Sequence, residues 1–111
     1  MLAEAADLHA GWRVLDVACG PGTLALAALH QGAAQVTGVD FSAEMVVLAQ
    51  GATLGRNAEF FLGDATGLPV PDGAFDVGAS SFGAIFAPDP RRAMSELHRA
   101  LTPGGRAGLL A

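Results

Sequence analysis

Residues 12–23 read WRVLDVACGPGT, and this stretch decides the fold. Residues 12–18 are mostly apolar and rich in Val and Leu, which predicts a buried strand. Gly20 and Gly22 predict a sharp turn, because a residue without a Cβ atom adopts backbone conformations that other residues avoid. Strong helix formers follow as far as Gly32 and predict a helix that ends there. A strand, a glycine turn and a helix in this order begin an α/β unit.

The alternation of apolar strands and helices continues along all 111 residues. Further strands are predicted at 35–40, 59–62, 75–81 and 106–111, and further helices at 2–8, 43–52 and 88–101. Apolar strands between helices predict a Rossmann-like, doubly wound parallel sheet of about five strands, in three αβα layers and one domain. Ser42 is expected to cap the helix that follows it, and Asp89 to lie near the positive end of the next helix. The TPGG sequence of residues 102–105 predicts a turn.

Composition argues against several classes of protein. The formal charge is −5 and every one of the six cations is an arginine, so the basic patch of a nucleic-acid binder is not expected. Arg91, Arg92 and Arg99 cluster, and we interpret them as the solvated face of one exposed helix. No apolar run approaches the roughly 18 residues of a membrane span. The single cysteine, Cys19, has no disulfide partner and no zinc spacing. We therefore expect a cytoplasmic protein without a metal, a membrane or a nucleic-acid partner.

Polar side chains follow several of the predicted strands. Asp16 comes just before the glycine turn, Asp40 ends the second strand, Asp64 follows the third, and Ser80 and Ser81 end the fourth. Because right-handed crossovers bring the carboxyl ends of parallel strands to one edge, these residues are expected to lie along the same edge of the sheet. Ligands of such sheets bind at that edge, where the strand order reverses. The distribution therefore predicts a ligand site there.

Five stretches in unbroken order resemble the motifs of class I S-adenosylmethionine (SAM)-dependent methyltransferases of the small-molecule type, which includes enzymes of ubiquinone and menaquinone biosynthesis. They are residues 14–22 (VLDVACGPG), Asp40, 63–76 (GDATGLPVPDGAFD), 75–90 (FDVGASSFGAIFAPDP) and 97–106 (LHRALTPGGR). The resemblance covers nearly the whole chain. It implies a SAM-dependent methyltransferase whose strands lie in the family order 3-2-1-4-5-7-6.

The resemblance also assigns residues to SAM. Gly20 and Gly22, with Ala18 in the same turn, would let the backbone and the following helix N-terminus approach the carboxylate of the cofactor. Asp16 would face its ammonium group. Asp40 would accept hydrogen bonds from both ribose hydroxyls. No catalytic residue is assigned, because an in-line displacement on an activated sulfonium needs alignment more than a general base.

The remaining cofactor contacts that the resemblance implies lie after the second, third and fourth strands. Phe41 would sit against the adenine or the ribose, and Met45 would line the same pocket, although a place in the hydrophobic core stays open for both. The side chain of Asp64 would accept from the adenine N6 amino group, and the N–H of Ala65 would donate to N1. Ser80 would contact the methionine part of SAM.

The glycines alone do not choose between cofactors. Gly20-x-Gly22-x-x-Ala25 also fits the loose fingerprint of dinucleotide-binding domains, so an NAD-binding domain stays an alternative. Asp16 favours SAM, because a carboxylate in this position suits an ammonium and a sulfonium better than a pyrophosphate. Asp40 suits both cofactors, since both contain the same ribose.

The family sheet has seven strands, and this chain supplies five. We therefore expect either an active methyltransferase with a small-molecule acceptor or a SAM-binding module that is inactive in isolation because the substrate half is missing. The predicted strand at 106–111 would form an apolar edge, and such edges recruit other strands. A homodimer that pairs along this edge is the corresponding hypothesis.

Overall fold

The computed structural model of the chain describes residues 11–80 and 89–109. Five strands form one parallel sheet in the order β3-β2-β1-β4-β5. Their bounds are β1 Arg13–Val17, β2 Gln35–Asp40, β3 Ala58–Leu62, β4 Phe75–Ser80 and β5 Leu101–Leu109. The parallel sheet of five strands is confirmed, and its order is that of the first five strands of the family that the sequence resembles. The helix predicted at 2–8 and the predicted site neighbour Ser81 lie outside the described residues.

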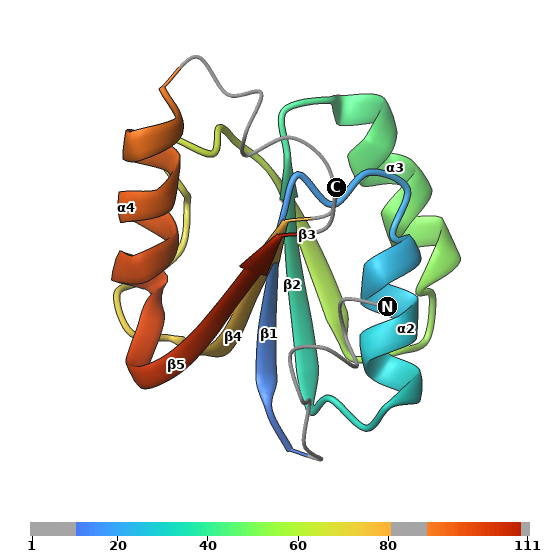
Figure 1. Cartoon of the computed structure of the whole chain (residues 1–111). Coiled ribbons are helices and arrows are strands. Elements are labelled where there is room, and N and C mark those ends of the chain that lie inside the picture. Colours follow the sequence, from blue (N-terminus) through green and yellow to red (C-terminus); the bar gives the residue numbers. More distant parts are fainter. Residues whose placement is uncertain (1–10, 81–88, 110–111) are drawn as a thin grey trace.

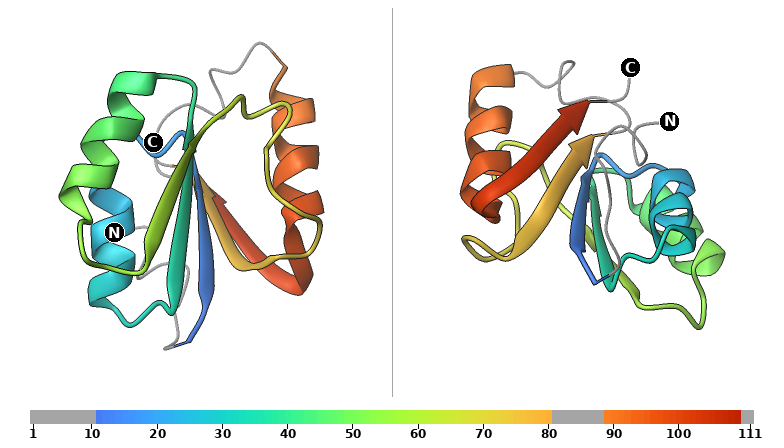
Figure 2. Two further views of the ribbon diagram at one scale, coloured as in Figure 1. Left: turned by 180° about the vertical axis from the view of Figure 1, so that it is seen from behind. Right: turned by 60° about the horizontal axis from the view of Figure 1, so that its bottom comes forward.

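Helices cover both faces of this sheet. Helices α2 (Thr23–His30) and α3 (Ala43–Ala52) lie on one face, and α4 (Pro90–Ala100) lies on the other (Figure 1). The same three layers are visible from behind and from below (Figure 2). Each face has its own apolar core: side chains of α2 and α3 pack against one side of the sheet, and side chains of α4 against the other. The predicted αβα layering is therefore confirmed.

Side chains alternate between the two cores along the central strand β1. Val14 packs in the core beneath α2 and α3, whereas Leu15 and Val17 pack in the core beneath α4. Because successive side chains of a strand point to opposite faces, Asp16 belongs to the face of α2 and α3. Its side chain is 0% exposed. The sequence thus places a buried carboxylate near the end of the central strand, where packing alone would favour an apolar residue.

The expected cap at Ser42 and the place of Asp89 near a helix start are confirmed, whereas α4 spans Pro90–Ala100 and not the predicted 88–101. The Ser42 hydroxyl accepts a hydrogen bond from the Met45 N–H at 3.3 Å, and the Asp89 carboxylate accepts from the Arg92 N–H at 3.1 Å. Pro90 lies in the first turn of α4, where a missing N–H has no cost because helix-start donors lack intrahelical partners. Each cap satisfies one backbone donor, so α3 and α4 begin at fixed residues.

The predicted bounds of the last strand were wrong. Leu101 already pairs with Phe75, and the next pairing joins Arg106 to Val77. The residues between Leu101 and Arg106 therefore form an irregularity inside β5 rather than a turn that precedes it. The reason is that α4 leads directly into the sheet, while the extra residues bulge out of the ladder, helped by a left-handed conformation at Gly104 (φ 81°).

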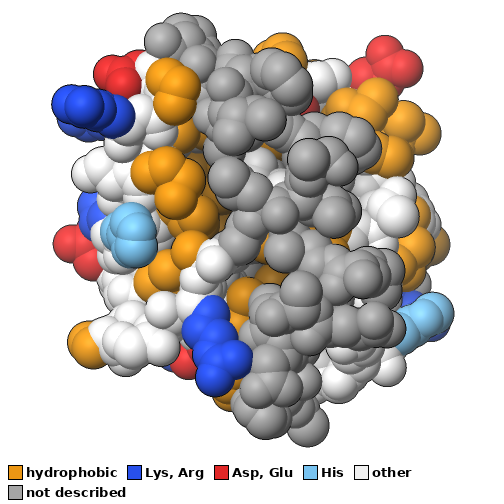
Figure 3. Space-filling view, viewed as in Figure 1, with side chains coloured by type: hydrophobic (Ala, Val, Ile, Leu, Met, Phe, Trp, Pro, Cys, Tyr) orange, Lys and Arg blue, Asp and Glu red, His pale blue; other side chains and the backbone are white. Residues whose placement is uncertain are grey.

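The described surface shows apolar side chains on the α3 side of the molecule, near the connection from β2 (Figure 3). The exposed large apolar residues of the described chain include Phe41 and Val47, with 82% and 65% of their surface exposed. Strand β5 lies at one edge of the sheet, where it pairs with β4 and has no second neighbour among the described strands. Pairing of two chains along β5 stays a prediction. No helix in the described ranges is long and apolar enough to span a membrane.

One ion pair ties β1 to β4 at the start of both strands. The Arg13 backbone N–H donates to the Asp76 carboxylate at 2.9 Å, and its guanidinium donates to both oxygens at 3.2 and 3.3 Å. These hydrogen bonds hold the pKa of Asp76 below its ordinary value, the side-chain bonds to Arg13 having the larger effect. The folded chain therefore binds the proton of Asp76 less readily than the unfolded chain does.

This difference makes stability depend on pH. The contribution of Asp76 is present above its ordinary pKa of about 4 and is lost as the pH falls through the lowered value in the folded state. We expect the free energy of unfolding, measured by urea denaturation between pH 7 and pH 2.5, to fall more in the wild type than in Asp76→Asn. Equal losses in the two proteins would contradict this assignment.

Candidate functional site

The strand order reverses at β1, because β2 pairs with one side of it and β4 with the other. Chain connections leave from this point in opposite directions, and the ends of the strands are therefore left uncovered by a crossover. The turn after β1, the residues after β2 and Ser80 at the end of β4 lie along this edge. Ser80 is buried and stands in register with Val17 of β1. The structure thus brings most of the predicted site residues to one edge of the sheet.

The turn after β1 has an unusual backbone. Ala18, Gly20 and Gly22 all have positive φ angles, of 60°, 55° and 94°. Gly22 also packs closely on α3, since a Cβ atom there would stand 3.2 Å from the Ala49 Cα. Glycine is required at that position for both reasons, whereas Ala18 adopts the left-handed region at some cost in strain. The sharp turn that the glycines predict is therefore present, and the predicted approach of its backbone to a ligand stays a prediction.

Helix α2 begins directly after this turn. Its N-cap residue is Gly22, which has no side chain to accept from the first-turn N–H groups, and the first turn contains no acidic residue. Helix starts of this kind attract anions, because the backbone donors and the helix dipole both favour negative charge. The N-terminus of α2 can therefore receive a carboxylate at the edge of the sheet.

Asp40 has a structural role that the sequence analysis missed. Its carboxylate is 6% exposed, and its two oxygens accept from the backbone N–H groups of Gly20 and Ser42, both at 2.9 Å. Asp40 thereby connects the turn after β1 to the start of α3. The bond to Ser42, two residues along the chain, is an Asx turn and could have been predicted from the sequence. The bond to Gly20 is long-range and could not.

The Asp40 carboxylate can still accept further hydrogen bonds, which is compatible with its predicted contacts to the ribose hydroxyls. A carboxylate offers about four lone-pair positions, and the two backbone bonds use one on each oxygen. The backbone carbonyl of Asp40 also accepts from the Gly63 N–H at 2.9 Å. This bond joins the end of β2 to the residue that precedes Asp64. Asp40 and the loop of Asp64 are therefore neighbours at the edge of the sheet.

Cys19 lies between acidic groups inside the turn. Burial raises the pKa of its thiol to about 12, and the charges of Asp16 and Asp40 contribute in the same direction. The thiol is therefore protonated at neutral pH, which supports a structural rather than a reactive role for Cys19. Asp40 also contacts this turn directly, through the Gly20 N–H.

The two apolar residues that follow Asp40 differ in their surroundings. Phe41 is 82% exposed, so a place in the hydrophobic core is wrong for this residue. Met45 is half-buried on the first turn of α3. An exposed aromatic ring directly beside a buried carboxylate offers apolar surface to a ligand that also carries hydroxyl groups.

Asp64 is exposed and held by its own loop. One carboxylate oxygen accepts from both the N–H and the hydroxyl of Thr66, each at 2.9 Å. These bonds, the backbone one first, lower the pKa of Asp64, so the side chain is ionised at neutral pH. Its carbonyl accepts from the Gly67 N–H at 3.0 Å, which closes a tight turn. Ala65 packs against the core beneath α4.

The interpretation of the arginine cluster as a solvated helix face is wrong for Arg99, which is half-buried, whereas Arg91 and Arg92 are exposed. The Arg92 Nε donates to the Thr66 carbonyl, and Arg99 is half-buried against the loop between β3 and β4. Arg92 is thus exposed and at the same time contacts this loop. These contacts join residues that are 26 to 31 positions apart, and no local pattern announces them.

Comparison with known proteins identifies relatives of this chain. A family described as a methyltransferase domain matches residues 14–105. A demethylmenaquinone methyltransferase of Thermus thermophilus is 42% identical over 97 residues, which cover 85% of this chain and 44% of that protein. The chain therefore spans less than half the length of this curated relative.

Solved structures agree with the sequence relatives. A SAM-dependent methyltransferase from Mesorhizobium loti has a TM-score of 0.83 and 31% identity over 94% of this chain and 49% of its own. The [4+2]-cyclase SpnF has a TM-score of 0.89 and 37% identity, over 97% of this chain and 41% of its own. Both structures share the fold.

The two backbone bonds of Asp40 lead to a stability prediction. In Asp40→Ala, the N–H groups of Gly20 and Ser42 lose their acceptor, and each unpaired buried donor costs about 1–3 kcal/mol. We expect the free energy of unfolding to fall by about 2–4 kcal/mol in urea denaturation without ligand. Glu59→Ala, which removes an exposed carboxylate from the edge strand β3, should change it by less than about 0.5 kcal/mol. Equal stabilities of the two variants would contradict the role given to Asp40.

Proposed function

The chain belongs to the methyltransferase domain family, and from this premise we propose that it binds SAM at the edge of the sheet formed by the ends of β1, β2 and β4. We propose further that the protein transfers the methyl group of SAM to a small-molecule nucleophile. The observation that carries the proposal is the buried Asp40 carboxylate, which fixes the glycine turn and keeps lone pairs for a ribose, beside the exposed ring of Phe41.

The residues at this edge fit the parts of SAM. The α2 N-terminus and the turn of Gly20 and Gly22 suit its carboxylate, and the buried Asp16 suits its ammonium group. Asp40 suits the ribose hydroxyls. The Phe41 ring suits the flat face of an adenine as an apolar surface. The Asp64 carboxylate suits the amino group at the edge of the adenine as an acceptor. Ser80 and Met45 complete the proposed contacts.

SAM, when bound, supplies a methyl group that is already activated by the adjacent sulfonium. The chain therefore needs to bind the cofactor and the acceptor, orient them and exclude water, rather than supply a strong base. Three aspartates at one edge of the sheet also favour a cofactor with positive charge over a doubly negative pyrophosphate. NAD is accordingly the less favoured ligand, although Gly20 and Gly22 fit its fingerprint.

The acceptor is proposed at the level of chemical class. A relative that methylates demethylmenaquinone favours a small, largely apolar acceptor with a ring hydroxyl or carbon nucleophile. The similarity to a [4+2]-cyclase makes a direct test of methyl transfer necessary. Labelled SAM with the reduced, hydroquinone form of a demethylmenaquinone analogue is the first assay, because this form carries the nucleophilic carbon and hydroxyl; transfer of label to it by the protein, with loss of a proton from the acceptor, would support the proposal. The proposal would be contradicted if no label were transferred to this acceptor or to other small acceptors.

Cofactor choice is tested separately from catalysis. We expect calorimetry to show binding of the product S-adenosylhomocysteine and no comparable binding of NAD. Tighter binding of NAD would contradict the proposal. This titration needs no acceptor, so it tests the binding site of the chain even where the substrate half of the protein is absent.

Phe41 provides a variant that leaves the core intact. Loss of its ring in Phe41→Ala should weaken S-adenosylhomocysteine binding roughly tenfold, about 1.4 kcal/mol, with little effect on stability because the side chain is 82% exposed. Leu54→Ala is the matched control: Leu54 is 86% exposed and lies beyond the C-terminal end of α3. Unchanged affinity in Phe41→Ala, or equal losses in both variants, would remove Phe41 from the site.

A further inference from the structure

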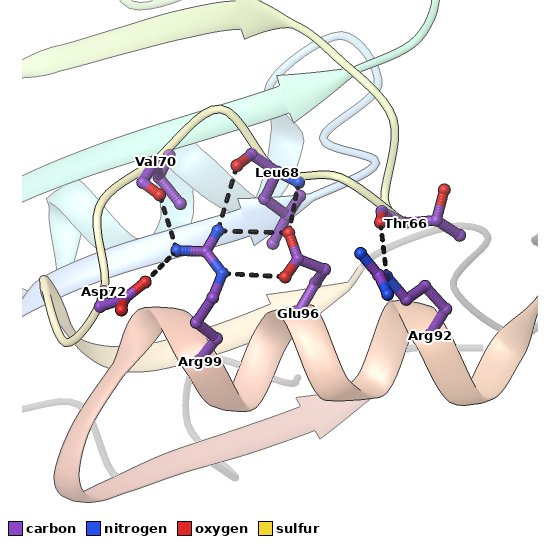
Figure 4. Close-up of polar contacts among 7 residues, drawn as sticks. All are labelled: Thr66, Leu68, Val70, Asp72, Arg92, Glu96 and Arg99. Carbon is purple, nitrogen blue, oxygen red and sulfur yellow. Dashed lines mark hydrogen bonds and ion pairs between the residues drawn. The ribbon is translucent and has the colours of Figure 1, made fainter.

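Helix α4 holds the loop between β3 and β4 through the backbone of that loop (Figure 4). The Arg99 guanidinium donates to the carbonyls of Leu68 and Val70, at 3.1 and 3.0 Å. The Glu96 carboxylate accepts from the Leu68 N–H at 2.8 Å. Leu68 itself is buried in the core beneath α4. Both backbone polar groups of Leu68 and its side chain are therefore held by α4.

Arg99 and Glu96 also fix one another. The Arg99 Nε lies 2.8 Å from one oxygen of Glu96, and a second guanidinium nitrogen lies 3.2 Å from the other oxygen. Asp72 at the far end of the loop accepts from the same guanidinium. Arginine presents a planar, rigid set of donors, so it holds several acceptors in one defined geometry. The pKa of Glu96 is lowered, chiefly by its hydrogen bonds to Arg99, and the carboxylate is therefore charged at neutral pH.

A second contact from α4 reaches the part of the loop next to Asp64. The Arg92 Nε donates to the Thr66 carbonyl at 3.2 Å, while the N–H and hydroxyl of Thr66 donate to Asp64. One residue thus connects the helix to the Asp64 carboxylate. Ala65 lies between Asp64 and Thr66 in the sequence. Helix α4 therefore contacts the residue that hydrogen-bonds the Asp64 carboxylate.

We propose that Arg92, Glu96 and Arg99 are positioning residues that give the cofactor site its selectivity for adenine, by holding Asp64 and the Ala65 N–H in place. The inference rests on the proposed function, in which Asp64 accepts from the N6 amino group and the Ala65 N–H donates to N1. Hypoxanthine reverses both atoms: it has a carbonyl at position 6 and an N–H at N1. An acceptor and a donor held at fixed places reject it, whereas a loose loop can turn away from the mismatch.

The test compares two ligands that differ only in the base, S-adenosylhomocysteine and S-inosylhomocysteine. In the wild type we expect S-adenosylhomocysteine to bind on the order of a hundredfold more tightly, as two mismatched hydrogen bonds suggest. In Arg99→Met this ratio should fall by about tenfold, because the loop loses its main contacts with α4. A purely structural role would weaken both ligands equally and leave the ratio unchanged.

Two further variants keep the test decisive. Arg92→Met removes one contact of an exposed side chain, so it should fold even where Arg99→Met does not, and it should lower the ratio about threefold. Arg13→Gln is the matched control, since it breaks another arginine–carboxylate pair at the opposite end of the strands and should leave the ratio within about twofold.

The outcomes separate this inference from the proposed function. Wild-type ratios in Arg92→Met and in folded Arg99→Met would overturn the inference. So would a wild-type chain that binds both ligands equally well, and in that case the proposed cofactor site would stand. A wild-type chain that binds neither ligand would overturn the proposed function and the inference together.

Discussion

The carboxylate of Asp40 is the contact on which the edge of the sheet depends. It accepts backbone hydrogen bonds from the turn after β1 and from the start of α3. The backbone carbonyl of Asp40 accepts from the N–H of Gly63, the residue before Asp64. Three loops that are separate in the sequence therefore meet at one residue. Because the carboxylate is buried and both oxygens are engaged by main-chain donors, its position is fixed before any ligand arrives. The proposed ribose contact uses what remains of the same group.

Two aspartates of the proposed site are held in different ways. Asp40 is held by backbone N–H groups inside the fold, so only rearrangement of the strand ends could move it. Asp64 is exposed and is held by Thr66, which depends in turn on Arg92. In the proposed site, the ribose contact is thus held through the main chain, whereas the base contact is held through side chains of α4. Substitutions on α4 could therefore change base preference without altering the turn after β1.

The sequence predicts those features that depend on local patterns. Apolar runs, glycine turns and the caps at Ser42 and Asp89 are local, and the structure confirms them. The residues of β5 and the contacts of Arg99 depend on partners far along the chain, and prediction failed there for that reason. Phe41 was ambiguous, because an apolar residue after a strand fits both a core and a ligand surface. Most of the proposed site residues nevertheless lie at one edge of the sheet, as the order of the motifs along the chain predicts.

The most direct test is a crystal structure of this chain with S-adenosylhomocysteine. We expect both ribose hydroxyls within hydrogen-bond distance of the Asp40 carboxylate, while the bonds from Gly20 and Ser42 are retained. The same crystal shows whether the adenine lies between Phe41 and Asp64. A ligand bound elsewhere, or an Asp40 that must release Gly20 to accept the ribose, would contradict the claim that one carboxylate both builds the turn and binds the cofactor.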